Sequence, residues 1–538
     1  MADAAGALGT SARRACAAIL PILAVACGGG GDAGGETIIV GMRNDFGGFN
    51  PVTNTDLYTG ELINYALFTP LVQYEPDLSV RPYLAESWRF EGDTAIVFTL
   101  RGDVRWHDGE PVTARDVAFT FELAKDPAAA SLLGSVFLVD VESATVMDSL
   151  TVRFDFARPH AQAIEDFWWA PLPRHLLEDV AADELRNAAF NREPVGSGPF
   201  RFAEWRSSER LVIEANPDFP EALGGPAASR RVVFRIVPEA STLLTELLTT
   251  GVHVDIPLLP DQIERIEGSS EVRLFSYPGR TVYYIGWNNE RPPFDDVRLR
   301  RALALAVDRG DIIDALLRGE GAIATSTIPP WHPLYPADIE PLGPDPDAAR
   351  ALLEEAGWTD RDGDGVRENA DGRPLRFTLL ASDDPLRRNV AEVLESQFRG
   401  VGAAVELRVM EFQTMLSRHR NRDFEAVFTN WVLDNFQVAA APYALFHTSQ
   451  AEVPLSANRS GVRIAELDRL IERGAIATDA ETQRRVWRDL TALIQEHQPI
   501  TFMFWLNELA AARTAVQGVE MDPRGELLTL PDWTLGGG

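Results

Sequence analysis

Short apolar strands alternate with amphipathic helices along almost the whole chain, and this alternation is the strongest constraint on its fold. TVYYIGWNN (281–289) and ITFMFW (500–505) are rich in the β-branched and aromatic residues that strands favour. Segments over about 462–475 and 480–497 have the apolar spacing of long helices. Such alternation predicts α/β or α+β lobes. At 538 residues the chain is too long for one ordinary core, so we expect two or three domains.

Capping residues predict where several helices begin and end. Thr113 precedes the helical pattern TARDVAFTFELAKDP, and the pair Asp295-Asp296 precedes DVRLRRALALAVD. Pro346 and Gly357 stand at the first position and at the end of a third helix, as proline and glycine commonly do.

Two further segments predict strands. TAIVFTLRGDVRW (94–106) predicts two strands joined by a turn at Gly102-Asp103. FEAVFTNWV (424–432) predicts a buried strand, and Asp434 follows it closely. An unpaired buried carboxylate costs several kcal/mol, so Asp434 needs a partner from the protein or from a ligand.

The first 36 residues have the features of an export signal. Arg13 and Arg14 precede the apolar run ACAAILPILAVA (15–26), which has about the length of a signal-peptide core and is too short to span a bilayer by itself. We therefore expect residues 1–26 to be a signal peptide. No later segment has 18 uninterrupted apolar residues, so we expect the rest of the chain to lie outside the membrane.

Cys27 is a candidate for lipidation. The stretch Ala24-Val25-Ala26-Cys27 resembles a bacterial lipobox, in which the cysteine carries lipid and becomes the mature N-terminus, although Ala24 stands where that motif prefers leucine. The glycine-rich residues 27–36 would then be a flexible tether that holds a folded domain near a membrane. The alternative is an ordinary cleaved signal peptide followed by an incidental cysteine.

Composition excludes several classes of function. Cys16 and Cys27 are the two cysteines of the chain, so the part after the tether has no thiol for a disulfide, a zinc-thiolate site or a cysteine nucleophile. With 50 basic and 80 acidic residues the formal net charge is −30, which argues against nucleic acid as a partner because duplex binding depends on Lys and Arg. An acidic surface that keeps the protein soluble explains this charge.

No motif of an enzyme is present in the sequence. The eight histidines show no i,i+3 or i,i+4 pair and no HExxH motif, and no phosphate-binding loop or dinucleotide fingerprint occurs. Gly196-Ser197-Gly198-Pro199 lacks the G-x-S-x-G spacing of a hydrolase nucleophile. A large exported chain without a catalytic motif favours binding over catalysis, and we expect no cofactor.

One acidic loop is a weak candidate for calcium. Asp360, Asp362 and Asp364 stand at alternate positions, and Asp371 falls at the twelfth position of such a loop. Arg367, however, occupies the eighth position, where calcium loops usually have an apolar residue. A Gly/Asp turn that supports a hairpin is the alternative.

Seven stretches, in order, resemble the family-5 solute-binding proteins of ABC transporters, which are peptide- and nickel-type extracytoplasmic receptors. The resemblance covers essentially everything after the tether, and seven ordered blocks are far more specific than one. The stretches are RPYLAESW (81–88), VRWHDGEPVTARDVAFTFE (104–122), PVGSGPF (194–200), PPFDDVRLRRALALAVDRGDII (292–313), AGWTDRDGDGVRE (356–368), NWVLDNF (430–436) and SGVRIAELDRLIERG (460–474).

The resemblance implies a periplasmic-binding-protein-like α/β fold of type II. It would be a clamshell with an extra domain, hence three lobes, and with crossing strands at the hinge. Domain I would be discontinuous, formed by residues 37–76, 196–286 and 507–538. Residues 77–195 would form domain II, and residues 287–506 domain III.

The resemblance also implies a ligand site. In peptide receptors of the family a Trp-x-x-Asp motif lies in the cleft and its Asp accepts the α-ammonium of the ligand; Trp431 and Asp434 match that pattern. Asn430 and Asn435 are neighbouring candidates. Peptide receptors commonly continue with an aromatic residue and Asp-Pro, whereas this chain continues from Asn435 to Val438 without them. A salt bridge or cap inside domain III is the alternative role for Asp434.

The function implied is that of a lipid-anchored receptor, in the periplasm or at the cell surface. It would capture a peptide or another amine-bearing solute and deliver it, as a monomer, to the transmembrane subunits of an ABC permease. A receptor of the same fold for a nickel complex or an oligosaccharide, a signalling receptor and a secreted hydrolase are the alternatives.

Overall fold

The structure is a computed structural model that describes residues 37–160, 163–433, 436–453 and 456–536. These residues all belong to one compact unit, Gly35–Gly538. No described helix combines the length and the apolar character needed to cross a membrane. The predicted signal peptide, Cys27 and the tether fall on residues 1–36 and lie outside the described residues.

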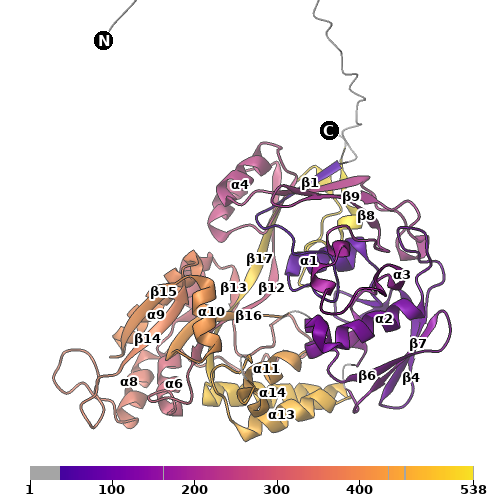
Figure 1. The fold of residues 1–538 in the computed structure, drawn as a ribbon. Coiled ribbons are helices and arrows are strands. Elements are labelled where there is room, and N and C mark those ends of the chain that lie inside the picture. The colour runs from indigo at the N-terminus through magenta and orange to yellow at the C-terminus, as the bar shows by residue number, and fades with distance from the viewer. Residues whose placement is uncertain (1–36, 161–162, 434–435, 454–455, 537–538) are drawn as a thin grey trace, which may run out of the picture. The chain divides into compact units, whose positions relative to one another are not determined.

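A large mixed sheet runs through this unit (Figure 1). Eleven strands of the described residues belong to it, and β13 (Gly321–Ile323) pairs with β17 beside the main order. The main order is β15 (Ala404–Met410), β14 (Arg376–Ser382), β16 (Ala426–Val432), β12 (Val272–Trp287), β17 (Ile500–Arg513), β11 (Val254–Ile256), β1 (Thr37–Met42), β10 (Arg231–Ile236), β9 (Arg210–Ala215) and β8 (Phe200–Arg206).

Two long antiparallel strands, β12 and β17, join the two halves of this sheet (Figure 1). The second half of β12, Thr281–Trp287, pairs with β16 as well as with β17, whereas its first half pairs with β17. The register shifts between Pro278 and Thr281. Gly279 is required there, since a Cβ at this position would lie 2.3 Å from the carbonyl oxygen of Leu506. Such an irregularity redirects a side chain, and here that side chain is Arg280.

A separate antiparallel sheet covers residues 85–156. Its order is β4 (Ala85–Phe90), β5 (Ala95–Leu100), β7 (Thr151–Phe156) and β6 (Val141–Val146). Helix α2 (Ala114–Lys125) packs against β6 and β7. Thr113 caps α2 in a capping box with Asp116, which confirms the predicted helix start.

The prediction of a second strand within 94–106 is wrong. Beyond β5 the chain forms one isolated bridge, from Arg105 to Pro111. The amide of Trp106 donates to the carbonyl of Glu110, and the amide of His107 donates to that of Gly196. The backbone groups that a hairpin would pair are therefore used in a tight loop that contacts the glycine-rich stretch near residue 196.

Other boundaries agree with the sequence. Asp296 caps α6, Pro346 is the first residue of α8, and α14 occupies 480–497 as predicted. Besides α2, the α-helices of the described residues are α1 (Leu57–Leu62), which continues as a π-helix (Ile63–Leu67), α3 (Arg174–Leu177), α4 (Ala240–Leu248), α5 (Ile263–Glu267), α6 (Val297–Leu305), α7 (Arg309–Leu317), α8 (Pro346–Glu355), α9 (Pro385–Gly400), α10 (Phe412–Arg420), α11 (Ala440–Phe446), α12 (Thr448–Ala451), α13 (Ala465–Ile476) and α14 (Ala480–His497). The remaining strands are β2 (Val72–Tyr74), β3 (Val80–Pro82), β18 (Val516–Gln517) and β19 (Thr534–Leu535).

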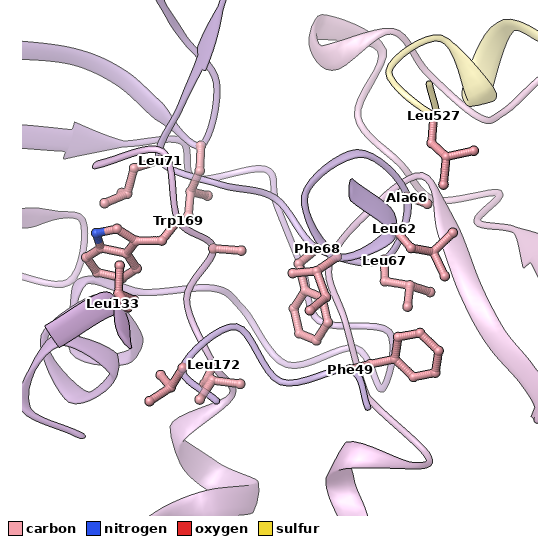
Figure 2. Close-up of a cluster of buried hydrophobic side chains, with 14 of the residues drawn as sticks. Phe49, Leu62, Ala66, Leu67, Phe68, Leu71, Leu133, Trp169, Leu172 and Leu527 are labelled. Atoms are coloured by element: carbon pink, nitrogen blue, oxygen red, sulfur yellow. The ribbon is translucent and has the colours of Figure 1, made fainter. Parts of the chain in front are cut away.

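The largest hydrophobic core joins segments that lie far apart in the sequence. Figure 2 shows Leu62 and Leu71 near the N-terminus, Leu133 and Trp169 about 60 to 100 residues further along the chain, and Leu527 near the C-terminus. Burial of these side chains holds the N-terminal and C-terminal segments in one body. The division into domains I, II and III stays a prediction.

Candidate functional site

A cavity of about 140 Å³ lies where several distant parts of the chain meet. These parts are the N-terminal stretch that contains α1, residues 132–137, the pair Trp168-Trp169, and three single residues, Arg280, Phe436 and Arg524. The residues that line it are Pro51, Asn54, Thr55, Asp56, Leu57, Gly60, Glu61, Ile63, Asn64, Tyr65, Pro70, Val72, Gln73, Tyr74, Leu132, Leu133, Phe137, Trp168, Trp169, Arg280, Phe436 and Arg524.

A buried ion pair lies at this cavity. Nη2 of Arg280 donates to Oε1 of Glu61 at 3.0 Å, and both side chains are at least 90% buried. The other carboxylate oxygen, Oε2, accepts from the amides of Glu526 at 2.9 Å and Leu527 at 3.1 Å. Burial, together with the charge of Glu526, raises the pKa of Glu61, while Arg280 and the Leu527 amide oppose this rise. The pair ties α1, β12 and the C-terminal segment together around the cavity.

Phe436 lines the cavity and packs against two other aromatic rings. Its ring meets Tyr74 edge-on, with centroids 4.8 Å apart, and Trp331 at 5.8 Å. The guanidinium of Arg280 lies 6.0 Å from the centre of the ring. Nε2 of His332 donates to the carbonyl oxygen of Phe436 at 3.2 Å, and burial lowers the pKa of His332 to about 4. A neutral imidazole therefore fixes the backbone of this residue at pH 7.

The next residue, Gln437, is bonded to a residue far away in the sequence. Its side-chain amide donates to the buried carboxylate of Asp166, which also accepts from Nε2 of His160 at 2.9 Å. Burial raises the pKa of Asp166, and the hydrogen bonds from His160 and Gln437 limit the rise. The segment that follows β16 is thus bonded to Asp166, two residues before Trp168, which lines the cavity.

Two of the predicted site residues, Trp431 and Asn430, lie on opposite faces of β16. Trp431 is half-buried and packs against the core cluster that contains Leu433 and Val438. Asn430 lies on the opposite face of β16, because consecutive strand residues alternate, and its Oδ1 accepts from Nη2 of Arg387 at 2.7 Å. Neither belongs to the described residues that line the cavity.

Asp434 and Asn435 lie outside the described residues. Their neighbours are described: the amide of Leu433 donates to the carbonyl oxygen of Arg280 at 2.9 Å, and Phe436 lines the cavity. The assignment of the four residues to the ligand site stays a prediction.

The candidate calcium loop brings together Asp360, Asp362, Asp364 and Glu368, whose carboxylate oxygens lie within 4.8 Å of one another. Asp371 is outside this group, and Glu368 stands in its place. The amides of the loop already bind these carboxylates; Gly363, for example, donates to Asp360 at 2.8 Å. Bridges from Glu368 to Thr359 and Pro374 give the loop the form of the hairpin turn that the sequence offered as the alternative. Calcium binding here stays a prediction.

Most residues that line the cavity carry no recognisable signal in the sequence. A signal existed for Arg280, which is a charged residue at the start of an apolar strand, and for the aromatic pair Trp168-Trp169. Phe436 belongs to the segment after Asp434, which differs from the corresponding segment of peptide receptors. Nothing in the sequence of this segment indicates that Phe436 lines a cavity. Glu61 gave no signal, since one acid in an amphipathic helix is usually exposed.

Comparisons with known proteins agree with this architecture. The model of the bacterial extracellular solute-binding proteins, family 5 Middle, matches residues 79–452. The oligopeptide-binding protein AppA of Bacillus subtilis is 28% identical over 512 residues, which are 93% of this chain and 92% of AppA. The dipeptide-binding protein of Escherichia coli is 26% identical over 513 residues, which are 91% of this chain and 93% of that protein.

Solved structures of similar fold include AppA of B. subtilis in complex with a nonapeptide, with a TM-score of 0.77, 27% identity and coverage of 93% of this chain and 99% of AppA. NikZ of Campylobacter jejuni in complex with Ni(L-His) has a TM-score of 0.80, 22% identity and coverage of 93% and 99%, a likeness that bears on the fold alone. These likenesses confirm the predicted fold class.

Proposed function

The chain belongs to the family-5 bacterial extracellular solute-binding proteins, and we propose that it is the peptide-binding receptor of an ABC importer. It captures a di- or oligopeptide and delivers it to the permease. Its two relatives named above are an oligopeptide-binding and a dipeptide-binding protein, which supports a peptide ligand. The receptor acts by binding and release, without making or breaking a bond.

One observation carries this proposal: the cavity at the junction of several distant chain segments. Its walls come from α1 with its flanks, from the region around Trp168, and from β12 together with Phe436. A site built from several segments can close around a ligand when they move relative to one another, and periplasmic binding proteins are a general example of such hinge closure. The permease would recognise the closed form.

We further propose that Asp434 accepts the ammonium of the ligand. Its described neighbours support this, because Leu433 is bonded to the backbone of Arg280 and Phe436 lines the cavity. A charge-assisted hydrogen bond in a closed, dry site is strong. Trp431, Asn430 and Asn435 are the neighbouring candidates, and their contribution is part of the same proposal.

The proposed location is outside the cytoplasmic membrane, in the periplasm or at the cell surface. Residues 1–26 would direct export, and a lipidated Cys27 would anchor the monomeric receptor through the tether of residues 27–36. Growth with a labelled fatty acid tests the anchor: label should enter the protein, and Cys27→Ser should abolish it. If the wild-type protein takes up no label and is not found in the membrane, residues 1–26 are an ordinary cleaved signal peptide and Cys27 is not lipidated.

A receptor for a nickel complex or an oligosaccharide remains the alternative within this family. Calorimetric titration separates the ligands, because a peptide receptor should bind short peptides and give no heat with a nickel–histidine complex or a sugar. Binding of either of these in place of peptides would overturn the proposal.

A further inference from the structure

We propose that the cavity takes one uncharged apolar side chain of the peptide, about as large as a phenyl ring, and discriminates against charged side chains. This inference rests on the proposed function, since it concerns how the same site reads a peptide. It follows from the size of the cavity, from its walls and from the pairing of its charges.

The size limits what fits. Pockets that enclose a whole ligand measure about 300–1,000 Å³, whereas this cavity measures about 140 Å³. An apolar protein cavity of about 150 Å³ is known to bind benzene. The space therefore matches one aromatic side chain, and the rest of the peptide must lie outside it.

The walls are largely apolar. Val72, Leu133 and Phe137 line the cavity and are buried, and Trp168 and Phe436 add two more aromatic surfaces. Phe137 and Trp168 meet edge-to-face, with ring centroids 5.7 Å apart. Aromatic rings prefer this geometry, so a third ring can join the same arrangement.

Each charged residue that lines the cavity has a hydrogen-bond partner within the protein. Among the described lining residues, Asp56 accepts from the amide of Thr59 at 2.8 Å, and both oxygens of Glu61 are bonded as described above. Arg524 binds Asp522 through Nε at 3.0 Å and donates from Nη1 to the carbonyl oxygen of Tyr74 at 3.0 Å. A charged ligand side chain would lose its hydration here without gaining a dedicated partner.

A peptide series tests the inference on the unaltered chain. The peptides are trialanine variants in which one position carries Phe, Ala, Lys or Glu, and each of the three positions is varied in turn. The Kd of each peptide is measured by calorimetry. At one position Phe should bind about 10- to 100-fold more tightly than Ala, which is the gain from burying an aromatic side chain. Lys and Glu at that position should bind more weakly than Ala.

A cavity-filling variant adds a second arm. Leu133→Phe should reduce the preference for Phe over Ala to about one-fold. Leu176→Phe is the matched control, because Leu176 is an exposed leucine that does not line this cavity. If Leu133→Phe fails to fold, the peptide series with the unaltered chain still decides.

The outcomes separate the two proposals. If every peptide binds but Phe and Ala give equal affinity at every position, this inference is overturned and the proposed function stands. The same holds if Lys or Glu is preferred. Failure of every peptide to bind would overturn both.

Discussion

Arg280 and Glu61 are 219 residues apart in the sequence, yet they form a buried ion pair of 3.0 Å at the cavity. Arg280 owes its position to the irregularity in β12 after Gly279. Glu61 owes its position to α1 and to the amides of Glu526 and Leu527. The pair therefore links the strand that joins the two halves of the large sheet to the helix that lines the cavity.

Breaking this pair should destabilise the protein strongly. Arg280→Met leaves the Glu61 carboxylate buried without its cation, and such losses cost about 3–5 kcal/mol. Chemical denaturation measures the change. Arg89→Met is the control, since Arg89 pairs with Glu91 at an exposed site and such pairs contribute about 0–1 kcal/mol. Equal, small effects of the two substitutions would show that the buried pair does not hold the cavity together.

Phe436→Ala should weaken both stability and ligand binding. The ring is 6% exposed and packs against Tyr74 and Trp331. Removing a buried phenyl ring costs about 3–5 kcal/mol, and we expect the lower end of this range because one side of the ring already faces the cavity. Phe90→Ala, at an exposed phenylalanine, should change the free energy of unfolding little. A Phe436→Ala protein with wild-type stability and peptide affinity would exclude this residue from the site.

Asp255 should make stability depend on pH between about 4 and 7. It is 1% exposed, its Oδ1 has no hydrogen-bond partner among the described residues, and burial raises its pKa to about 7 although Arg43 opposes the rise. Between about pH 4 and pH 7 the unfolded chain has released this proton and the folded chain still holds it. Its contribution to the free energy of unfolding therefore falls by about 1.4 kcal/mol per pH unit, and by about 4 kcal/mol in all.

Asp255→Asn removes this dependence. Relative to wild type, the variant should gain stability steadily from pH 4 to pH 7 and gain nothing more above pH 8, as measured by denaturation at each pH. Asp148→Asn is the control, because Asp148 is exposed and hydrogen bonds to Leu150 and Thr151 lower its pKa. A constant difference between Asp255→Asn and wild type across this range would show that the carboxyl titrates normally.

Asp434→Asn should weaken binding of a peptide with a free amino terminus by about 2–5 kcal/mol, since it leaves the buried ammonium without its carboxylate. The N-acetylated peptide is the control: it should bind wild type weakly, and the substitution should not weaken it further. Calorimetry on the four combinations measures the coupling. Additive effects of substitution and acetylation would place the ammonium elsewhere.

The sequence predicts the elements well where local signals decide them. Thr113 and Asp296 cap the predicted helices, and α14 has the predicted limits. The last strand, predicted to end at Trp505, is β17 and runs to Arg513, because LNELAAAR contains residues that favour helices and becomes a strand through burial between β12 and β11. The intrinsic secondary-structure propensity of a residue contains no information about neighbouring strands that come from elsewhere in the chain.

The cavity is harder to predict for the same reason. The family resemblance points to the segment after β16, and Phe436 in that segment does line the cavity. Glu61, Trp168 and Arg280 reach the same place from three distant parts of the chain. Their meeting depends on long-range packing and on the irregularity after Gly279, neither of which leaves a pattern of residues in the sequence.

The central claim, that this receptor binds peptides, is tested most directly by calorimetric titration of the purified protein after unfolding and refolding to remove any bound ligand. We predict that a short peptide with free termini binds one to one with a Kd in the micromolar range or below, and that a nickel–histidine complex and an oligosaccharide produce no binding heat. Saturable binding of the nickel complex or of the sugar by a folded protein that ignores every peptide would contradict the claim.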